Sequence, residues 1–212
     1  MKIYTILFLA LFGTYFTSFA QKNGGGKERA DADLKALHNG YLFFQLFDRE
    51  DTKNSIRNHL GEKAVQQYEA EEKEKQDNLM KAFRENYTFS KVLFFYSHDK
   101  EKIKNNDFSS VKFYTDSNQL VSNDTIDFSH FFIGEVSRIE IDSSIYTDEK
   151  GVEHKTPNYS FSALIVRDRN FVQLGNPFPY YVRTMEGMPL LQKKSYRLIA
   201  SFQNKLERKL KD

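Results

Sequence analysis

The stretch FSALIVRDRNFVQLGNPFPYYV, residues 161–182, decides the fold. It consists of an apolar run at 163–166, a polar turn at 167–170 and a second, shorter apolar run at 171–174. Short apolar runs that are bounded by turn residues are typical of buried strands. We therefore predict a buried hairpin here, followed by a rigid exit because two prolines fix the backbone after it.

The first twenty residues have the pattern of a cleavable signal peptide. Lys2 supplies a positive charge, 3–12 is an apolar run, and Ser18-Phe19-Ala20 places small residues at the positions that a signal peptidase reads. The apolar run is too short to span a bilayer, which takes about 20 residues. We expect residues 1–20 to be removed, no transmembrane segment to remain, and the protein to be exported to the periplasm or the extracellular space. An uncleaved membrane anchor is the alternative.

The rest of the chain divides into a linker and one domain. Residues 21–29 contain three consecutive glycines, whose ordering loses much backbone entropy, so we expect a flexible linker. Residues 30–212 have the length of a single domain, since domains commonly run to about 100–200 residues. The absence of cysteine excludes thiolate metal ligands and a cysteine nucleophile. A net charge of +2 is too small for us to expect a nucleic-acid partner.

Apolar runs and helical patterns alternate along the domain. This alternation predicts the α/β class, with a mixed β-sheet, packed helices and a C-terminal helix. We expect a βαβ unit with a right-handed crossover over 92–114 and a bulge or bend at Gly134. A single helix over 30–47 is the alternative to the first strand. The expected strands are 41–47, 92–96, 111–114 and 131–141, and the expected helices are 30–39, 48–87 with a break at Gly61, 100–106 and 189–209.

The middle of the long expected helix, residues 69–78, is almost wholly charged. Glu69 precedes Lys73 and Glu71 precedes Lys75 by four residues, the spacing and order that stabilise a helix surface. We expect a solvated face that is held by these two ion pairs, and an acidic partner-binding face is the alternative.

Two segments carry a resemblance to known proteins. FSKVLFFYS at 89–97 and ALIVRDRNFVQLGNPFPYYVRT at 163–184 resemble a group of uncharacterised exported proteins of the Bacteroidetes. The most specific pieces are FFYS at 94–97 and PFPYYV at 177–182. The resemblance implies export and a single domain. It implies no activity, ligand or catalytic residue.

Acidic side chains follow three of the expected strands. Asp48, Asp99 and Asp116 come just after strand ends, and His98 stands beside Asp99. Open α/β sheets bind ligands at the carboxyl ends of their strands, and oxygen-rich clusters there can hold Mg²⁺ or Ca²⁺. These residues are therefore candidate metal ligands, with His98 and Asp99 as candidate catalytic residues. Helix caps and turns need the same residue types, which gives a purely structural alternative.

The expected C-terminal helix is strongly basic and carries a narrow apolar stripe. Such a helix can lie on an anionic surface, or it can simply pack on the sheet with its basic end complementing the helix dipole. The segment 177–181 could present its rings to a carbohydrate or peptide, or form a buried connection. The candidate basic binding residues are Lys193, Lys194, Arg197, Lys205 and Arg208.

No motif in the chain specifies a reaction or a cofactor. We therefore expect an exported envelope protein that acts as a non-catalytic binding or structural module, with another envelope protein or a surface polymer as its partner. A metal-dependent hydrolase that uses the acidic strand ends is one alternative. Peripheral membrane association through the basic helix is the other.

Overall fold

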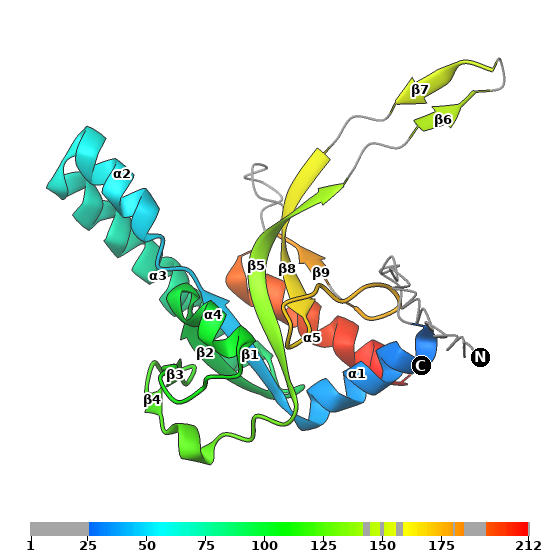
Figure 1. The fold of residues 1–212 in the computed structure, drawn as a ribbon, viewed down its shortest axis with the longest axis horizontal. Helices are drawn as coiled ribbons and strands as arrows, with labels where there is room; N and C mark the ends of the chain where they lie inside the picture. The colour runs from blue at the N-terminus through cyan, green and yellow to red at the C-terminus, as the bar shows by residue number, and fades with distance from the viewer. Residues whose placement is uncertain are drawn as a thin grey trace, which may run out of the picture.

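A mixed sheet of seven strands lies at the centre of the structure, which is a computed structural model (Figure 1). Across the sheet the order is β4-β3-β2-β1-β5-β8-β9. The central strands β2, β1 and β5 are parallel, and the outer pairs are antiparallel. The strands are β1 (Tyr41–Leu46), β2 (Lys91–Tyr96), β3 (Phe113–Tyr114), β4 (Leu120–Val121), β5 (Phe131–Ile141), β8 (Tyr159–Arg167) and β9 (Tyr181–Arg183).

Helices pack on this sheet, and a helix ends the chain, so the predicted α/β class and single domain are confirmed. The helices are α1 (Lys27–Asn39), α2 (Glu50–Leu60), α3 (Glu62–Asn86), α4 (Lys100–Lys104) and α5 (Ser195–Lys211), with short 3₁₀ turns η1 (Ser97–Asp99) and η2 (Asn123–Thr125). The structure describes residues 26–141, 145–148, 151–155, 159–179, 181–184 and 194–211.

Strand β1 is buried on both faces, which is why its sequence reads as a nearly continuous apolar run. Successive side chains of a strand point to opposite faces. Phe44 lies in a core with residues of α1, α3 and α5, whereas Phe43 lies in a second core with Ile103 of α4 and Phe113. Burial of each such side chain contributes about 1.5–3 kcal/mol to stability. The helices α1, α3 and α5 therefore cover one face of the sheet, and α4 with the loops near it covers the other.

The hairpin expected within 161–182 forms only in part. Residues 163–166 are buried in β8, but the second run is not a strand, and a single bridge joins Arg167 to Gln173. The neighbours of β8 are β5, along nine residue pairs, and β9. The first apolar run is therefore a core strand, but its partners are more distant in the sequence than the turn predicts.

Two further expectations about the sheet are wrong. Strand β3 is antiparallel to β2, so residues 92–114 do not form a βαβ unit. Gly134 pairs regularly with Phe44 and Val166, without a bulge. A side chain at Gly134 would place its Cβ 2.8 Å from the Phe44 ring, so the glycine is required for close packing.

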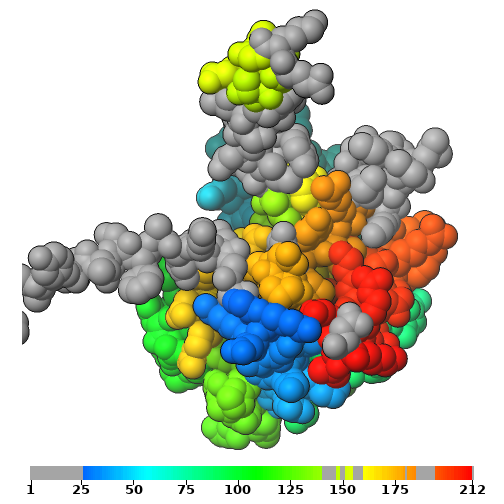
Figure 2. Space-filling model, turned by 90° about the vertical axis from the view of Figure 1, so that its right-hand side faces the viewer, coloured from blue at the N-terminus to red at the C-terminus, as the bar shows by residue number. Residues whose placement is uncertain are grey.

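Strands β6 (Ile145–Thr147) and β7 (Glu153–Lys155) form a separate two-stranded sheet. This hairpin stands away from the body of the molecule in both views (Figures 1 and 2). Gly151, between these strands, has a φ of +78°, a left-handed conformation that glycine adopts without a steric penalty.

Several boundaries differ from those expected. Helix α1 begins at Lys27, so residues 27–29 of the expected linker are helical. The expected signal peptide and residues 21–25 lie outside the described residues, as do residues 185–193, which include Lys193 and the expected start of the last helix. In the described part of the chain, no helix is both long and apolar enough to cross a membrane.

Candidate functional site

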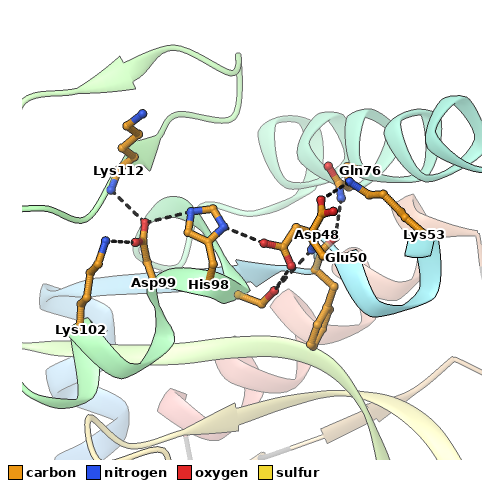
Figure 3. Close-up of polar contacts among 10 residues, drawn as sticks. Asp48, Glu50, Lys53, Gln76, His98, Asp99, Lys102 and Lys112 are labelled. Carbon is orange, nitrogen blue, oxygen red and sulfur yellow. Dashed lines mark hydrogen bonds and ion pairs between the residues drawn. The ribbon is translucent and has the colours of Figure 1, made fainter. Parts of the chain in front are cut away.

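The carboxyl ends of β1 and β2 meet at one edge of the sheet. The two strands are parallel, with Leu46 beside Tyr96, so Asp48 and His98 follow at the same level. Nδ1 of His98 lies 2.7 Å from Oδ2 of Asp48 (Figure 3). The structure thus brings together two of the acidic and histidine residues that the sequence pattern selects.

Asp48 accepts two short hydrogen bonds. The hydroxyl of Ser97 donates to its Oδ1 at 2.7 Å, and His98 bonds the other oxygen. Partial burial opposes ionisation of Asp48, but these hydrogen bonds outweigh it and hold the pKa of the carboxyl below its usual value. Because an ionised carboxylate can only accept, Nδ1 of His98 carries the proton in this contact.

Asp99 is the buried member of the cluster, with its side chain 2% exposed. Nζ of Lys102 donates to its Oδ1 at 2.7 Å, and the backbone N–H of Lys112 donates to its Oδ2 at 3.3 Å. The same Oδ2 lies 3.7 Å from Nε2 of His98 (Figure 3). Asp99 therefore connects α4, the chain entering β3 and the His98 ring.

Asp116 does not join this cluster. Because β3 is antiparallel to β2, its carboxyl end is directed toward the opposite edge of the sheet. Asp116 accepts a hydrogen bond from Ser117 at 3.1 Å. Across the described ranges, no three or more His, Asp or Glu side chains form a group that could hold a metal ion. The set Asp48, Asp99 and Asp116 is therefore not a three-carboxylate metal site.

The cluster has the residue types of a catalytic triad without its geometry. A serine nucleophile needs its hydroxyl directed at the histidine, but Ser97 donates to Asp48. Nε2 of His98, the atom that would receive a substrate proton, faces Asp99. The ring of His98 is 58% exposed and lies parallel to that of Tyr96. This arrangement holds β1, β2 and α4 together.

The sequence pattern missed the contribution of α2 and α3 to this edge. Nε2 of Gln76 donates to the carbonyl oxygen of Phe47 at 3.0 Å, which fixes the middle of α3 over the end of β1. Lys53 of α2 bonds Glu50 at 2.5 Å and lies 3.4 Å from Glu69 (Figure 3 shows Lys53 and Gln76). The sequence offers no local signal for such contacts, because they depend on how α2 and α3 pack.

The two ion pairs expected along α3 are replaced by others. Glu69 pairs with Lys53 of α2 and not with Lys73. Lys73 pairs with Asp77, and Lys75 pairs with Glu72. The residues at 69–78 are mostly exposed, as expected, but one of their carboxylates, that of Glu69, pairs with Lys53 of α2.

The basic residues of α5 lie in two separate places. Lys205 and Arg208 line a hollow of about 260 Å³, together with Lys209 and the residues of the segment 176–181 that the structure describes. That segment, drawn in orange, lies beside the red α5 in Figure 2. Lys194 and Arg197 are at the other end of the helix, where Arg197 bonds the hydroxyl of Tyr196. Two candidate binding segments of the sequence therefore form one pocket.

This hollow, which we call the basic pocket, has apolar walls and a cationic side. Its walls include Pro177, Phe178 and Pro179. Lys205 is held in place because its Nζ donates to the carbonyl oxygen of Tyr181 at 2.9 Å. No Asp or Glu of the described residues lines it. The apolar residues of α5, such as Phe202 and Leu206, are buried in the core on its other side.

Comparisons with protein-family models, with curated proteins and with solved structures found no match to this chain.

Proposed function

We propose that the protein is an exported, non-catalytic binding protein that holds an anionic polymer of the cell envelope in the basic pocket. The observation that carries this proposal is the lining of that pocket, to which Arg208 and Lys209 contribute cations and no Asp or Glu of the described residues contributes a carboxylate. Cations that lack an opposite charge nearby attract anionic groups of a ligand. The half-exposed prolines offer apolar contact beside them.

Part of this basic character also suits the helix itself. Cations near the C-terminus of a helix interact with its dipole by about 0.3–1 kcal/mol each. That effect explains one or two basic residues in the last turn of α5, but not their convergence with the segment 176–181. The convergence depends on the path of the chain before and after β9, and it favours a binding role.

Insertion of α5 into a membrane is disfavoured. Its apolar stripe, which includes Leu198, Ile199 and Phe202, is buried against the sheet. A helix that lies in a membrane interface needs such a stripe free. Any contact of α5 with an anionic surface would therefore be made by its charged side chains.

Export is part of the same proposal and rests on residues 1–20 of the sequence. The pattern of a positive residue, a short apolar run and small residues before Gln21 supports cleavage after Ala20. Expression in the native host, followed by N-terminal sequencing of the mature protein, should give Gln21 as the first residue. A mature protein that retains residues 1–20 would contradict export by this route.

The binding proposal can be tested with dextran sulfate as a model polyanion and uncharged dextran as its neutral counterpart. We expect the wild type to bind dextran sulfate and not dextran, as measured by biolayer interferometry. Arg208→Glu combined with Lys209→Glu should weaken binding at least about tenfold, because two attractive charges become repulsive.

The matched control reverses two exposed charges elsewhere. Lys63 on α3 and Lys104 on α4 are exposed and lie outside the basic pocket. Lys63→Glu combined with Lys104→Glu changes the net charge by the same amount, and binding should fall far less. Equal loss in both double variants would show a non-specific charge effect and contradict the proposal.

A further inference from the structure

A further cavity, of about 450 Å³, lies between the carboxyl end of β1 and the neighbouring part of β5. Its walls include residues 44–47 of β1 and the chain after it, Leu79 of α3, Val136 of β5 and Leu198 of α5. We call it the β1–β5 crevice. Its volume is within the range of small-molecule sites, about 300–1,000 Å³.

The path of the chain changes direction at this place in the sheet. From β1 the chain reaches β2 through α2 and α3, and α3 packs on the face that α1 and α5 also cover. From β2 it reaches β5, on the other side of β1, through α4 on the opposite face. In open α/β sheets, ligands bind at the carboxyl ends of strands where the connections change direction in this way. The topology therefore places a ligand between β1 and β5.

The two strands separate where the crevice begins. Strand β1 pairs with β2 as far as Leu46, but its pairing with β5 ends at Phe44, opposite Gly134. Beyond that pair, β5 curves away from β1 (Figure 1). Leu46 of β1 and Val136 of β5, which follow the last pair, both line the crevice.

Much of the crevice wall is apolar. Phe47, Leu79 and Val136 line it and are only half-buried, so they keep apolar surface in contact with water. Leu46 and Leu198 are buried beside them. An apolar group of a ligand that covers this wall removes its surface from water, which is favourable.

The charged groups of the crevice leave one cation in surplus. Among the described residues, its lining holds Arg49, Lys75 and a single carboxylate, that of Glu72. Nζ of Lys75 donates to Oε1 of Glu72 at 2.6 Å and neutralises it. Nε of Arg49 lies 3.9 Å from Oε2 of Glu72, which is too far for a hydrogen bond. The Arg49 side chain is 54% exposed, so its guanidinium can reach an anion that enters from water.

The backbone of Arg49 is strained. Arg49 precedes α2 with φ 46° and ψ 43°, in the left-handed region. Glycine or asparagine adopts this conformation more readily than arginine does. Such strained residues cluster at ligand sites, where the surrounding structure maintains them. The turn alone therefore does not explain an arginine here, whereas a role for its guanidinium, 5.8 Å from the centre of the Phe47 ring, does.

We propose that the β1–β5 crevice binds a small amphipathic anion, which is a carboxylate or phosphate on an apolar stem. The guanidinium of Arg49 bonds the head group, since it presents parallel N–H donors that match the oxygens of either anion. The stem lies against Phe47, Leu79 and Val136. The site is independent of the basic pocket, because Leu198 is near the start of α5 and Arg208 is near its end.

Isothermal titration calorimetry on the full chain tests this site. The probes are octanoate and octyl phosphate for the two head groups, 1-octanol for an uncharged stem, and octylammonium for the opposite charge. At least one of the anions should bind at millimolar concentration or below, and 1-octanol and octylammonium should bind at least about tenfold more weakly. The anion with the higher affinity identifies the head group. Failure of both anions to bind, or equal binding of 1-octanol, would overturn the proposal.

The decisive variant is Arg49→Asn, which removes the guanidinium and suits the left-handed backbone. It should weaken binding of the preferred anion about tenfold, because hydrogen bonds between two charged groups are lost. The melting temperature should stay equal or rise, because the backbone strain is relieved. An arginine that served only to pair with Glu72 would give the reverse, a lower melting temperature with unchanged affinity, and that result would overturn the proposal.

The matched control makes the same substitution elsewhere on α2. Arg57 bonds Glu62 at 3.0 Å and is not among the described residues that line the crevice. Arg57→Asn should leave the affinity for the anion unchanged. Equal weakening by Arg49→Asn and Arg57→Asn would show a general charge effect and contradict the site.

Discussion

The carboxyl edge of the sheet and the basic pocket differ in where their charges find partners. At the edge, Asp48, His98 and Asp99 bond one another and nearby groups of the same chain. In the basic pocket, Arg208 and Lys209 stand beside Lys205 with no carboxylate of the described residues in the lining. Charges that are neutralised within the fold hold its elements together, whereas charges of one sign that gather at the surface attract a ligand.

This comparison assigns opposite consequences to mutation in the two regions. Changes at the carboxyl edge should lower stability and leave polyanion binding intact. Changes in the basic pocket should weaken polyanion binding and cost little stability, about 0.3–1 kcal/mol for each cation that is removed from the end of α5. Substitution in the central sheet should remove both, because each region is positioned by the strands.

The largest effect is expected for Ile165→Asp in β8. Ile165 is fully buried between β5 and β9, and an unpaired carboxylate there should destabilise the fold by at least about 4 kcal/mol. Circular dichroism should show an unfolded chain. Ile165→Val, which loses one methyl group, should remain folded with a loss of about 0.5–1.5 kcal/mol. A folded Ile165→Asp protein would contradict the central position of β8.

A smaller loss of stability is expected for Asp99→Ala. The change leaves the backbone N–H of Lys112 without its partner and frees Lys102, which should lower the free energy of unfolding by about 1–3 kcal/mol in urea denaturation. Asp116→Ala is the matched control and should change it by less than about 0.5 kcal/mol, because Asp116 is outside the network. Similar losses of unfolding free energy in Asp99→Ala and Asp116→Ala would contradict the stabilising role of the Asp99 network.

The smallest effect is a pH dependence at Asp48. The folded protein lowers the pKa of this carboxyl below its usual 3.8, so the stabilisation is complete above that value and is lost as the pH falls through the lowered pKa. Wild type should therefore exceed Asp48→Asn in unfolding free energy at pH 7, and the difference should shrink toward pH 3. A difference that is constant with pH would show that Asp48 acts without its charge.

Local patterns were sufficient for the elements but not for their partners. The apolar runs of β1, β2 and β8 and the helical stripes of α3 and α5 are properties of neighbouring residues, and they predicted these elements. The antiparallel direction of β3 and the pairing of β8 with β5 depend on contacts between distant segments. No spacing within 92–114 distinguishes the observed connection, which passes through α4 to an antiparallel β3, from a βαβ crossover to a parallel strand.

The same limit applies to the sites. Asp48 and His98 could be selected because each directly follows an apolar strand, and parallel strands bring their ends together. Asp116 was selected by the same rule and lies elsewhere because its strand is antiparallel. The basic pocket forms because the chain between β8 and α5 brings the prolines next to the end of α5. The sequence therefore indicates its two parts, Lys205 with Arg208 and the prolines, but not that they lie side by side.

The salt dependence of dextran sulfate binding tests the central claim most directly. Binding that is driven by Lys205, Arg208 and Lys209 should weaken steeply as salt rises from 50 to about 300 mM, because salt screens exposed charges. In the Arg208→Glu, Lys209→Glu variant the remaining binding should be weak and nearly independent of salt, and the protein should stay folded with only the small loss of stability that the helix dipole predicts. Equal affinity and equal salt dependence in the wild type and this variant would contradict the assignment of the basic pocket as the binding site.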